Sequence, residues 1–575
     1  MKIKLNGIEF NANKGDTILD VASKNGFHVP TLCHLKLDDM CYENKPVSCR
    51  ICMVEILSNN TLVPACGTEV YDGLEVDIDS SKAINARRTN MELLLSNHPN
   101  DCLFCDRSTN CDLQKMAFDL NVRNVRYKGE RSNYGVDKSS RSIIKNLDKC
   151  ILCRRCESIC SKVQTVDVYS DIHRGFETVI APAFNSPLHE TTCTFCGQCV
   201  SVCPTAALTE VNNVDKVWDA INDDNKVVLV QTAPAVRVAI AEEFGAPAGS
   251  PSTGQMVASL RRIGFDYVFD TNWAADLTIM EEANEIMNRL NGNGKLPILT
   301  SCCPAWVKFI EHQFPSLIDI PSSCKSPHEM FGAIAKTYFA KKMNIPSENI
   351  VVVSVMPCVA KKYEAARSEL ETRGNKDVDL VITTREFARM VKEAGISYLE
   401  LPKEEFDNPL GASSGAGQIF GSTGGVLEAA LRTVSSWLGD DSDDSLTFEA
   451  VRGLEGIKES SIMVGDREVR VAAAHGLGNA RKLLEKIENG ENLYDVIEIM
   501  ACPGGCIAGG GQPYHHGNRD VIRKRMESMY AIDDKKLIRR SHENGDIKRV
   551  YKDYLGEVGG EKAHDLLHTH YKKRG

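Results

Sequence analysis

The sequence lacks a membrane-spanning run, a secretion signal and an excess of positive charge. It contains no stretch of about 18 apolar residues, the length that a membrane-spanning helix requires. Residues 1–26 have no apolar core followed by a cleavage site, so they do not indicate a signal peptide. The net charge of -10 argues against nucleic acid as the main partner. We therefore expect a cytoplasmic protein without a membrane or nucleic-acid partner.

Cysteine is the residue that the sequence has in excess, with 22 among 575 residues. In a secreted protein these residues would suggest disulfides, but in a reducing cytoplasm clustered cysteines indicate metal binding. A chain of this length is expected to contain several domains. The cysteines occur in separate groups, and the spacing within each group indicates a different metal site.

The N-terminal 80 residues predict a small β-rich module. Two short strand-like stretches flank Asn6-Gly7, a strong hairpin signal, and a helix capped by Asp16 or Thr17 follows. Four cysteines then occur in a plant-ferredoxin-like order with a widened first gap, which favours a 2Fe-2S cluster over a structural zinc ion. These cysteines are Cys33, Cys49, Cys52 and Cys66. Cys41 lies between them and is expected to be a free thiol.

The second group combines one histidine with three cysteines within residues 98–111. Its members are His98, Cys102, Cys105 and Cys111. Such a set can bind either zinc or a 4Fe-4S cluster, and the spacing alone does not decide between them.

The third group contains two runs with the spacing Cx2Cx2Cx3C. This repeat is typical of bacterial two-cluster ferredoxins, in which each run gives its fourth cysteine to the other cluster. We therefore expect one 4Fe-4S cluster on Cys150, Cys153, Cys156 and Cys203, and a second on Cys193, Cys196, Cys199 and Cys160.

A basic connector, residues 123–145, precedes these runs. It carries seven lysines and arginines against Glu130 and Asp137, a local net charge of +5. A solvated linker is the simpler interpretation. The sharper hypothesis is a landing surface that steers an acidic electron carrier towards the clusters.

From about residue 210, apolar strands alternate with amphipathic helices, which predicts an α/β domain with parallel sheets. The expected strands are 227–230, 296–299, 350–355, 380–383, 469–473 and 496–500. Three of them lead directly into cysteines, at the end of the strand where open α/β sheets bind ligands. Four thiolates can therefore converge on one buried cluster: Cys303, Cys358, Cys502 and Cys506. Gly415 to Phe420 misses the dinucleotide-binding pattern, so we expect close packing beside the cofactor there.

The three cysteine-bearing segments carry a family resemblance. TSCCPAW (300–306), MPCVAKKYE (356–364) and EIMACPGGCIAGGGQP (498–513) resemble the three signature segments of the FeFe hydrogenases. With the N-terminal groups, the resemblance covers essentially the whole chain, and the second group resembles the His-ligated 4Fe-4S module that these enzymes share with respiratory complex I.

The resemblance implies an H-cluster, a 4Fe-4S cubane joined through one cysteine to a diiron unit with CO, cyanide and a bridging azadithiolate. The implied enzyme is a ferredoxin hydrogenase that interconverts protons plus electrons with dihydrogen. One 2Fe-2S cluster and three accessory 4Fe-4S clusters would pass the electrons. The implied partners are ferredoxin or flavodoxin and the maturation proteins that insert the diiron unit, and the implied oligomeric state is a monomer.

Roles for individual residues follow from the same resemblance. Cys303, Cys358, Cys502 and Cys506 would bind the cubane, with Cys506 as the bridge, and Lys361 would hydrogen-bond a cyanide. The diiron unit would be walled by Ala233, Pro234, Ser326, Met356, Phe420 and Met500. Protons would pass through Cys302, Glu282, Ser322, Glu285 and Arg289. Cys324 is expected to be a buried small hydrophobe, and His328 departs from the glutamine usual in the family.

The resemblance also implies a multidomain α+β and α/β fold. The expected parts are a β-grasp 2Fe-2S ferredoxin domain (1–80), a His/Cys3 4Fe-4S module (81–126), a two-cluster 4Fe-4S ferredoxin domain (127–210) and a large α/β catalytic H-cluster domain (211–575). Two alternatives stay open. The chain can be the catalytic subunit of an electron-bifurcating or NAD-linked complex, or a sensory or assembly iron-sulfur protein of the same fold. A complex I-like electron-transfer subunit would share the first 210 residues only. No nucleotide-binding motif is present, so a complex would need partner subunits for that chemistry.

Overall fold

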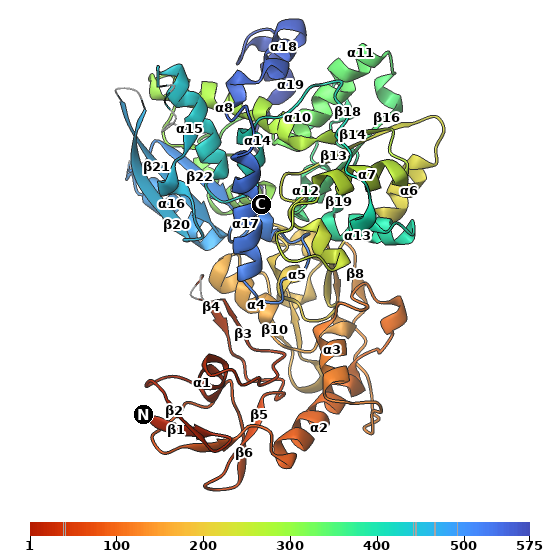
Figure 1. Cartoon of the computed structure of the whole chain (residues 1–575), viewed down its shortest axis with the longest axis vertical. Helices are drawn as coiled ribbons and strands as arrows, with labels where there is room; N and C mark the ends of the chain where they lie inside the picture. Colours follow the sequence, from red (N-terminus) through yellow and green to blue (C-terminus); the bar gives the residue numbers. More distant parts are fainter. Residues whose placement is uncertain are drawn as a thin grey trace. The chain divides into compact units, whose positions relative to one another are not determined.

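The fold is described from a computed structural model (Figure 1). It describes residues 1–37, 40, 42–440, 442, 446–464, 467–491 and 493–574. Cys41, expected to be a free thiol, lies outside the described residues. The chain divides into two compact units. Unit 1 consists of Met1–Lys162, Asp167–Thr191 and Val202–Thr209, and unit 2 of Val163–Val166, Thr192–Ser201 and Glu210–Gly575.

Unit 1 begins with a five-stranded sheet in the order β2-β1-β7-β5-β6. Its strands are β1 (Lys2–Leu5), β2 (Ile8–Asn11), β5 (Met53–Ile56), β6 (Thr61–Pro64) and β7 (Glu75–Asp77). β1 and β2 pair antiparallel across Asn6-Gly7, so the predicted hairpin is confirmed. Thr17 caps α1 (Ile18–Lys24) through a reciprocal capping box with Asp20. An apolar core beneath this sheet includes Cys52 and Cys66.

The remainder of unit 1 is made of short elements. Its helices are α2 (Ser81–Asn97), α3 (Asp112–Asp119) and α4 (Arg155–Ser158). Its strands are β3 (Leu35–Leu37), β4 (Tyr42–Asn44), β8 (Val136–Asp137), β9 (Ile143–Asn146), β10 (Ser170–Ile172) and β11 (Val179–Ala181). The boundary between the units falls within α5 (Gln198–Val202) and β12 (Leu208–Glu210). Three cysteines, Cys33, Cys49 and Cys153, belong to the second apolar core of unit 1.

Unit 2 contains a fully parallel sheet in the order β14-β13-β16-β19. Its strands are β13 (Val227–Thr232), β14 (Tyr267–Asp270), β16 (Ile350–Met356) and β19 (Leu380–Thr383). Valine, isoleucine and leucine dominate β13 and β16 because both faces of a central parallel strand are buried. Three strands match predicted ones, and β14 was not predicted.

The second sheet of unit 2 has the order β15-β22-β21-β20. Its strands are β15 (Ile298–Leu299), β20 (Ile457–Val464), β21 (Arg467–His475) and β22 (Val496–Met500). β15, β22 and β21 are parallel, but β20 pairs antiparallel with β21. The expectation of purely parallel sheets is therefore wrong at this edge. β20 is largely solvent-facing and alternates polar with apolar residues, as an antiparallel edge strand can.

Helices cover both sheets of unit 2 (Figure 1). The longer ones are α6 (Val214–Ile221), α7 (Thr253–Ile263), α8 (Thr271–Leu290), α9 (Pro304–Gln313), α10 (Pro327–Ile334), α13 (Thr384–Glu393), α15 (Gly425–Trp437), α16 (Leu477–Glu488) and α17 (Asp520–Asp533). The shorter ones are α11 (Ala340–Met343), α12 (Ala360–Glu364), α14 (Gly415–Ile419), α18 (Gly545–Val550) and α19 (Glu561–Leu567). A two-stranded ribbon joins β17 (Glu371–Thr372) to β18 (Asn375–Lys376). None of the described helices is long and apolar enough to cross a membrane.

The glycine-rich segment 415–425 is a packing element, as predicted. A Cβ on Gly417 would lie 2.4 Å from the carbonyl oxygen of Asn272, and one on Gly425 would lie 1.9 Å from that of Ile419. These approaches exclude any side chain. They allow α14 to pack closely against α8, the helix that carries Glu282 and Glu285.

Candidate active site and cluster ligands

Four cysteines follow the carboxyl ends of three strands in unit 2. Cys303 follows β15 and immediately precedes α9. The first residue of α9 is Pro304, and proline is favourable at the first position of a helix. Cys358 lies between β16 and α12, and Cys502 and Cys506 follow β22. The two sheets therefore present their predicted ligands from the ends of strands.

Burial raises the pKa of each of these four thiols, and for Cys358 the value is raised to about 12. Repulsion from the neighbouring cysteines adds to this effect at Cys358, Cys502 and Cys506, which shows that the thiols are close enough to interact. Buried thiols of this kind become thiolates when a cation binds them. The donor set therefore fits an iron-sulfur cluster.

A mostly apolar cavity of about 60 Å³ adjoins these cysteines. Cys302, Cys358 and Cys506 line it. Four of the six residues predicted to wall the diiron unit also line it: Ala233, Pro234, Met356 and Phe420. Ser326 precedes the lining residue Pro327, and its buried hydroxyl has no hydrogen-bond partner. Met500 is buried at the end of β22 but is not among the lining residues. An unpaired hydroxyl beside an apolar cavity suits a polar ligand.

Lys361 extends from α12 into the same cavity. Its ammonium donates to the carboxylate of Glu364 at 2.6 Å and to the carbonyl oxygen of Cys302 at 3.1 Å. Burial opposes the charge of Lys361, but the Glu364 carboxylate outweighs it and raises the pKa. His328 binds the same carboxylate at 2.7 Å. The lysine thus remains a cation that can donate to an anionic ligand.

The predicted proton relay begins at a buried carboxyl group. Glu282 lies on α8, and burial, followed by the charge of Glu285, raises its pKa to about 8. Its Oε2 has no hydrogen-bond partner. Burial also raises the pKa of the Cys302 thiol, and the Glu282 carboxyl raises it further. A carboxylic acid that exchanges its proton near neutral pH therefore interacts with a thiol on the cavity wall.

The outer half of the relay is joined by direct hydrogen bonds. The hydroxyl of Ser322 donates to Glu285 Oε2 at 2.8 Å, and Arg289 binds the other oxygen of Glu285 at 2.5 Å. Arg289 also donates to the carbonyl oxygens of Ile320 and Pro321. The structure therefore brings together Ser322, Glu285 and Arg289, while Cys302 and Glu282 form a second interacting pair.

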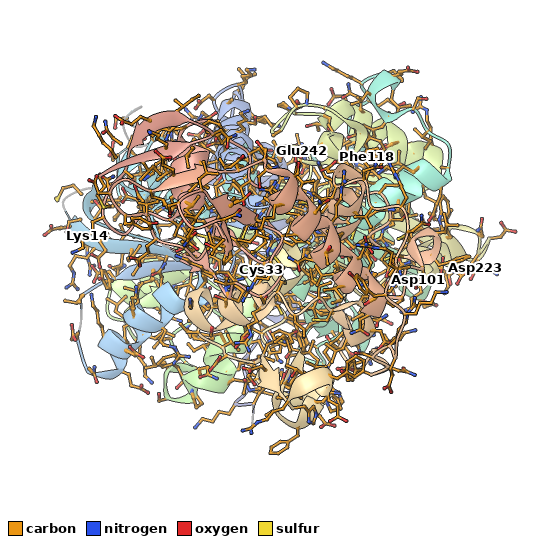
Figure 2. All side chains as sticks on the ribbon, turned by 90° about the horizontal axis from the view of Figure 1, so that it is seen from below. Lys14, Cys33, Asp101, Phe118, Asp223 and Glu242 are labelled. Atoms are coloured by element: carbon orange, nitrogen blue, oxygen red, sulfur yellow. The ribbon has the colours of Figure 1, made fainter. Side chains whose placement is uncertain are left out.

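The cysteines of the first N-terminal group are all buried, among them Cys33, which is labelled in Figure 2. Cys33 interacts with Cys49 and Cys66, and Cys66 also interacts with Cys52. The hydrogen bond from Cys66 lowers the pKa of Cys52 to about 7. Each thiol of this group thus contacts at least one other.

His98 shows the features of a ligand. It is buried, and burial lowers its pKa to about 4, so the imidazole is neutral. Its Nδ1 has no hydrogen-bond partner. Cys111 lies before α3, and burial raises its pKa. A neutral imidazole with a free nitrogen is the form that binds a metal.

Ligand-type side chains also gather outside the predicted cysteine groups. Among the described residues, groups of three ligand atoms within 4.8 Å of one another occur at Glu285, Cys324 and His568 and at His328, Glu329 and Glu364.

The third cysteine group divides between the units. Cys150, Cys153, Cys156, Cys160 and Cys203 belong to unit 1. Cys193, Cys196 and Cys199 belong to unit 2. Within unit 2, the ammonium of Lys308 on α9 donates to the carbonyl oxygen of Cys193 and lies 4.0 Å from the centre of the Phe195 ring. Helix α9 thus links the segment at Cys193 to Cys303.

Comparison with known families gives matches along the whole chain. Residues 226–510 match the model "Iron only hydrogenase large subunit, C-terminal domain", and residues 519–574 match "Iron hydrogenase small subunit". The N-terminal matches are a 2Fe-2S iron-sulfur cluster binding domain (1–81), an NADH-ubiquinone oxidoreductase-G iron-sulfur binding region (87–126) and a 4Fe-4S dicluster domain (149–207).

The NADP-reducing hydrogenase subunit HndD of Solidesulfovibrio fructosivorans is 53% identical over 581 residues, covering 100% of this chain and 99% of that protein. The chain belongs to the iron-only hydrogenase family. Iron hydrogenase 1 of Clostridium pasteurianum is 38% identical over 99% of this chain and 100% of its own length. A solved structure of the FeFe-hydrogenase HydA1 from Chlamydomonas reinhardtii has 42% identity and a TM-score of 0.57, and covers 64% of this chain and 100% of that one.

The sequence did not assign a role to two residues near this hydrogenase site. Glu364, which holds Lys361, lies three positions after it on a helix, so the spacing was a usable signal. His568 contacts Ser323 at 2.8 Å across 245 residues of sequence, and no local pattern could reveal that contact. Cys324 is buried as expected, but its thiol also points at Glu285, 4.0 Å away.

Proposed function

We propose that this iron-only hydrogenase catalyses the reversible reduction of protons to dihydrogen at an H-cluster bound by Cys303, Cys358, Cys502 and Cys506. One observation carries the proposal. Cys302, Cys358 and Cys506 line one cavity, and Cys302 interacts with a buried carboxyl, Glu282, whose pKa is raised to about 8. A redox cluster site with its own proton carrier suits chemistry that combines electrons with protons.

The chain's own residues supply binding, orientation and protons. When bound, the H-cluster provides the redox chemistry. Cys506 would be the cysteine that joins the two parts of the H-cluster, and Lys361, held by Glu364, would donate a hydrogen bond to a cyanide ligand. The apolar wall excludes bulk water, so protons pass only through positioned groups. Cys302 exchanges its thiol proton with Glu282, and Ser322, Glu285 and Arg289 continue the relay outwards.

The accessory clusters form an electron path through the remaining cysteines. The proposal places one 2Fe-2S cluster in residues 1–80, one His-ligated 4Fe-4S cluster in residues 81–126, and two 4Fe-4S clusters in residues 127–210. Residues 211–575 form the catalytic domain. Within the described part of the chain, the buried imidazole nitrogen Nδ1 of His98 has no hydrogen-bond partner, which supports the second assignment.

Ferredoxin or flavodoxin is the proposed electron partner, and a subunit role in an NADP-linked complex is the second candidate. The relative from Solidesulfovibrio fructosivorans, which is named as a subunit of an NADP-reducing hydrogenase, favours the second. Six of the seven basic side chains in residues 123–145 are exposed, whereas Lys145 is buried beside Asn185. The exposed six can attract an acidic partner in either arrangement.

Hydrogen evolution from reduced viologen, measured by gas chromatography, tests the main proposal. The diiron unit is supplied during expression or in vitro, and wild-type protein is compared with Cys302→Ala. Wild type should evolve hydrogen rapidly. The rate of the variant should be lower by at least about 100-fold, although its iron content is unchanged, because a positioned proton donor accelerates the reaction by that factor or more.

The controls separate the alternatives. Protein without the diiron unit should be inactive. No hydrogen from loaded wild-type protein would favour an assembly or sensory role. Equal turnover in wild type and Cys302→Ala would remove Cys302 from the relay, and assays with NADPH and with reduced ferredoxin would separate the two partner candidates.

A further inference from the structure

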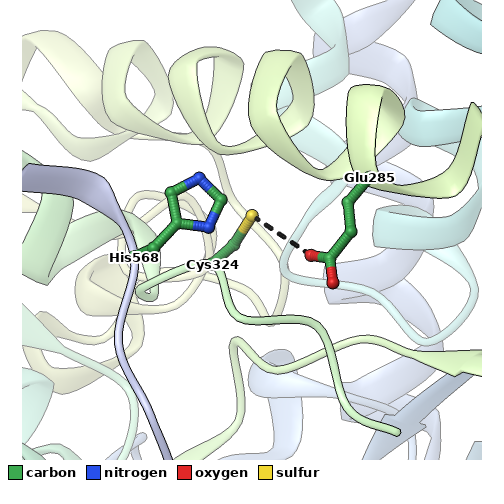
Figure 3. Close-up of side chains that lie close together, drawn as sticks. All are labelled: Glu285, Cys324 and His568. Carbon is green, nitrogen blue, oxygen red and sulfur yellow. Dashed lines mark hydrogen bonds between the residues drawn. The ribbon is translucent and has the colours of Figure 1, made fainter. Parts of the chain in front are cut away.

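Glu285 has a second set of neighbours that the relay through Arg289 does not use. Figure 3 shows the Cys324 thiol between the carboxylate of Glu285 and the imidazole of His568. The thiol donates towards Glu285 Oε2 at 4.0 Å, and one ring nitrogen of His568 lies within 4.8 Å of both other ligand atoms. A carboxylate, a thiol and an imidazole therefore meet at one point.

Hydrogen bonds fix the imidazole of His568 on both sides. Its Nδ1 binds the hydroxyl of Ser323 at 2.8 Å, and its Nε2 binds the buried carboxylate of Glu281 at 3.1 Å. Glu281 also accepts hydrogen bonds from the hydroxyl of Tyr551 and the backbone of Gly559. The ring orientation is thus determined by groups from α8, the C-terminal segment and residues 322–325.

The C-terminal segment is itself joined to the relay. The backbone N–H of Thr569 donates to the carbonyl oxygen of Ser323, and that of Lys325 donates to Leu567. The hydroxyl of Tyr571 donates to the carbonyl oxygen of Ser322 at 2.6 Å. These bonds hold His568 beside the residues that carry Ser322.

A path to solvent continues from His568. The exposed imidazole of His564 stacks on that of His568 with ring centres 4.7 Å apart. Arg289, on the other branch, is held by hydrogen bonds to Glu285 and to the carbonyl oxygens of Ile320 and Pro321. Histidine is the side chain best suited to accept and release protons near neutral pH. The outer carboxylate thus has a better proton donor on its C-terminal side.

We propose that His568 delivers protons to Glu285 through Cys324, as a second access route to the proton relay. This inference rests on the proposed function. In each transfer the imidazolium of His568 gives its N–H proton to the sulfur of Cys324, while the thiol gives its own proton to Glu285 Oε2. The thiol is unchanged, the carboxylate becomes a carboxylic acid, and the neutral imidazole recovers a proton from buffer beside His564. One water molecule or a small rotation of the thiol closes the remaining gap.

The groups that face His568 bear on its pH dependence. The titratable groups that face it are Glu281 and Glu285 on α8, Cys324 and His564. Burial raises the pKa of the Cys324 thiol well above the ordinary value, so this thiol is neutral. Because delivery of a proton by histidine requires the imidazolium form, the route should contribute most at acidic and neutral pH and fade at alkaline pH.

The test compares hydrogen evolution by the loaded holoenzyme and its His568→Gln variant between pH 5.5 and 9. Glutamine retains hydrogen bonding but carries no exchangeable charge. Below about pH 7, the hydrogen-evolution rate of the variant should fall on the order of tenfold. This decrease is smaller than the one expected when the only proton donor is removed, because the Arg289 branch remains. The ratio should approach one at pH 9, and added imidazole should restore the lost rate. A pH-independent ratio, or no effect of imidazole, would overturn the proposal.

Three further variants make the result specific. Cys324→Ala should reproduce the acid-side loss. His570→Gln, an exposed histidine in the same segment, is the matched control and should behave as wild type. Glu285→Gln should abolish most turnover. Full turnover by Glu285→Gln would refute the relay itself, whereas its inactivity together with an unaffected His568→Gln would refute only the second route.

Discussion

The two units are stabilised in different ways. Unit 2 encloses its sheets in two large apolar cores made almost entirely of aliphatic and aromatic side chains. The second core of unit 1 is small and contains Cys33, Cys49 and Cys153. Unit 1 also leaves large apolar side chains in solvent, with Leu103 and Phe104 each 90% exposed between two predicted ligands. Apolar burial can fold unit 2, whereas unit 1 needs its clusters as cross-links.

This difference explains why the cysteine-rich unit 1 can be built from short helices and strands. A bound cluster fixes four side chains at once and replaces the constraint that a long strand or helix would otherwise supply. In unit 2 the predicted ligands lie at the ends of β16 and β22, so the proposed H-cluster would occupy a framework that exists without it. Three predictions examine this comparison.

Removal of iron should have the largest effect. Chelation under reducing conditions should increase hydrogen exchange throughout residues 98–111 and 150–160, because these segments lose their ligand bonds. β13 and β16 should keep their protection because they lie at the centre of an apolar core. Hydrogen–deuterium exchange by mass spectrometry measures both in one sample. Equal loss of protection in the two units would contradict the comparison.

Packing should also separate the units. Gly417→Ala should destabilise unit 2 by about 2–3 kcal/mol, because the added methyl group collides with the carbonyl oxygen of Asn272. Gly129→Ala in unit 1 meets no atom within 4 Å and should change stability by less than about 0.5 kcal/mol. The thermal unfolding midpoints of the two variants test this pair. Equal changes in the midpoint would show that unit 2 is not tightly packed around Gly417.

Electrostatics should give an effect that depends on pH. The pKa of Glu282 is about 8 in the folded protein and about 4.3 when unfolded, so folding favours the protonated form. This stability is complete below about pH 4 and falls by roughly 1.4 kcal/mol per pH unit until about pH 8. Glu282→Gln should therefore become progressively more stable than wild type as the pH rises from 5 to 8. Unfolding midpoints measure the trend, with the exposed Glu130→Gln as control; parallel pH curves would contradict it.

The fold could be predicted where the signal is local. The Asn6-Gly7 hairpin, the Thr17 cap and the valine-rich strand at 350–356 each depend on neighbouring residues, and each is present in the structure. The antiparallel pairing of β20 with β21 was missed because strand direction at a sheet edge is set by tertiary packing. β14 was not predicted, although β19, a strand of the same length, was.

The site shows the same division. Cysteine spacing indicates the ligand groups because each cluster constrains a few nearby residues. The roles of individual residues in the H-cluster site remain predictions that the geometry supports. Contacts such as His328 with Glu364 and His568 with Glu281 join residues far apart in sequence, and only the folded chain reveals them.

Helix α9 has a consequence for the speed of electron transfer. Its first residue follows Cys303, and the ammonium of its Lys308 donates to the carbonyl oxygen of Cys193. One helix therefore connects a predicted H-cluster ligand to the segment that carries a predicted ligand of another cluster. Electron tunnelling weakens exponentially with distance, and one turn of this helix is about 5.4 Å long. Because the predicted ligands Cys193, Cys196 and Cys199 belong to the same compact unit as Cys303, Cys358, Cys502 and Cys506, α9 would help to set the tunnelling distance between the two proposed clusters.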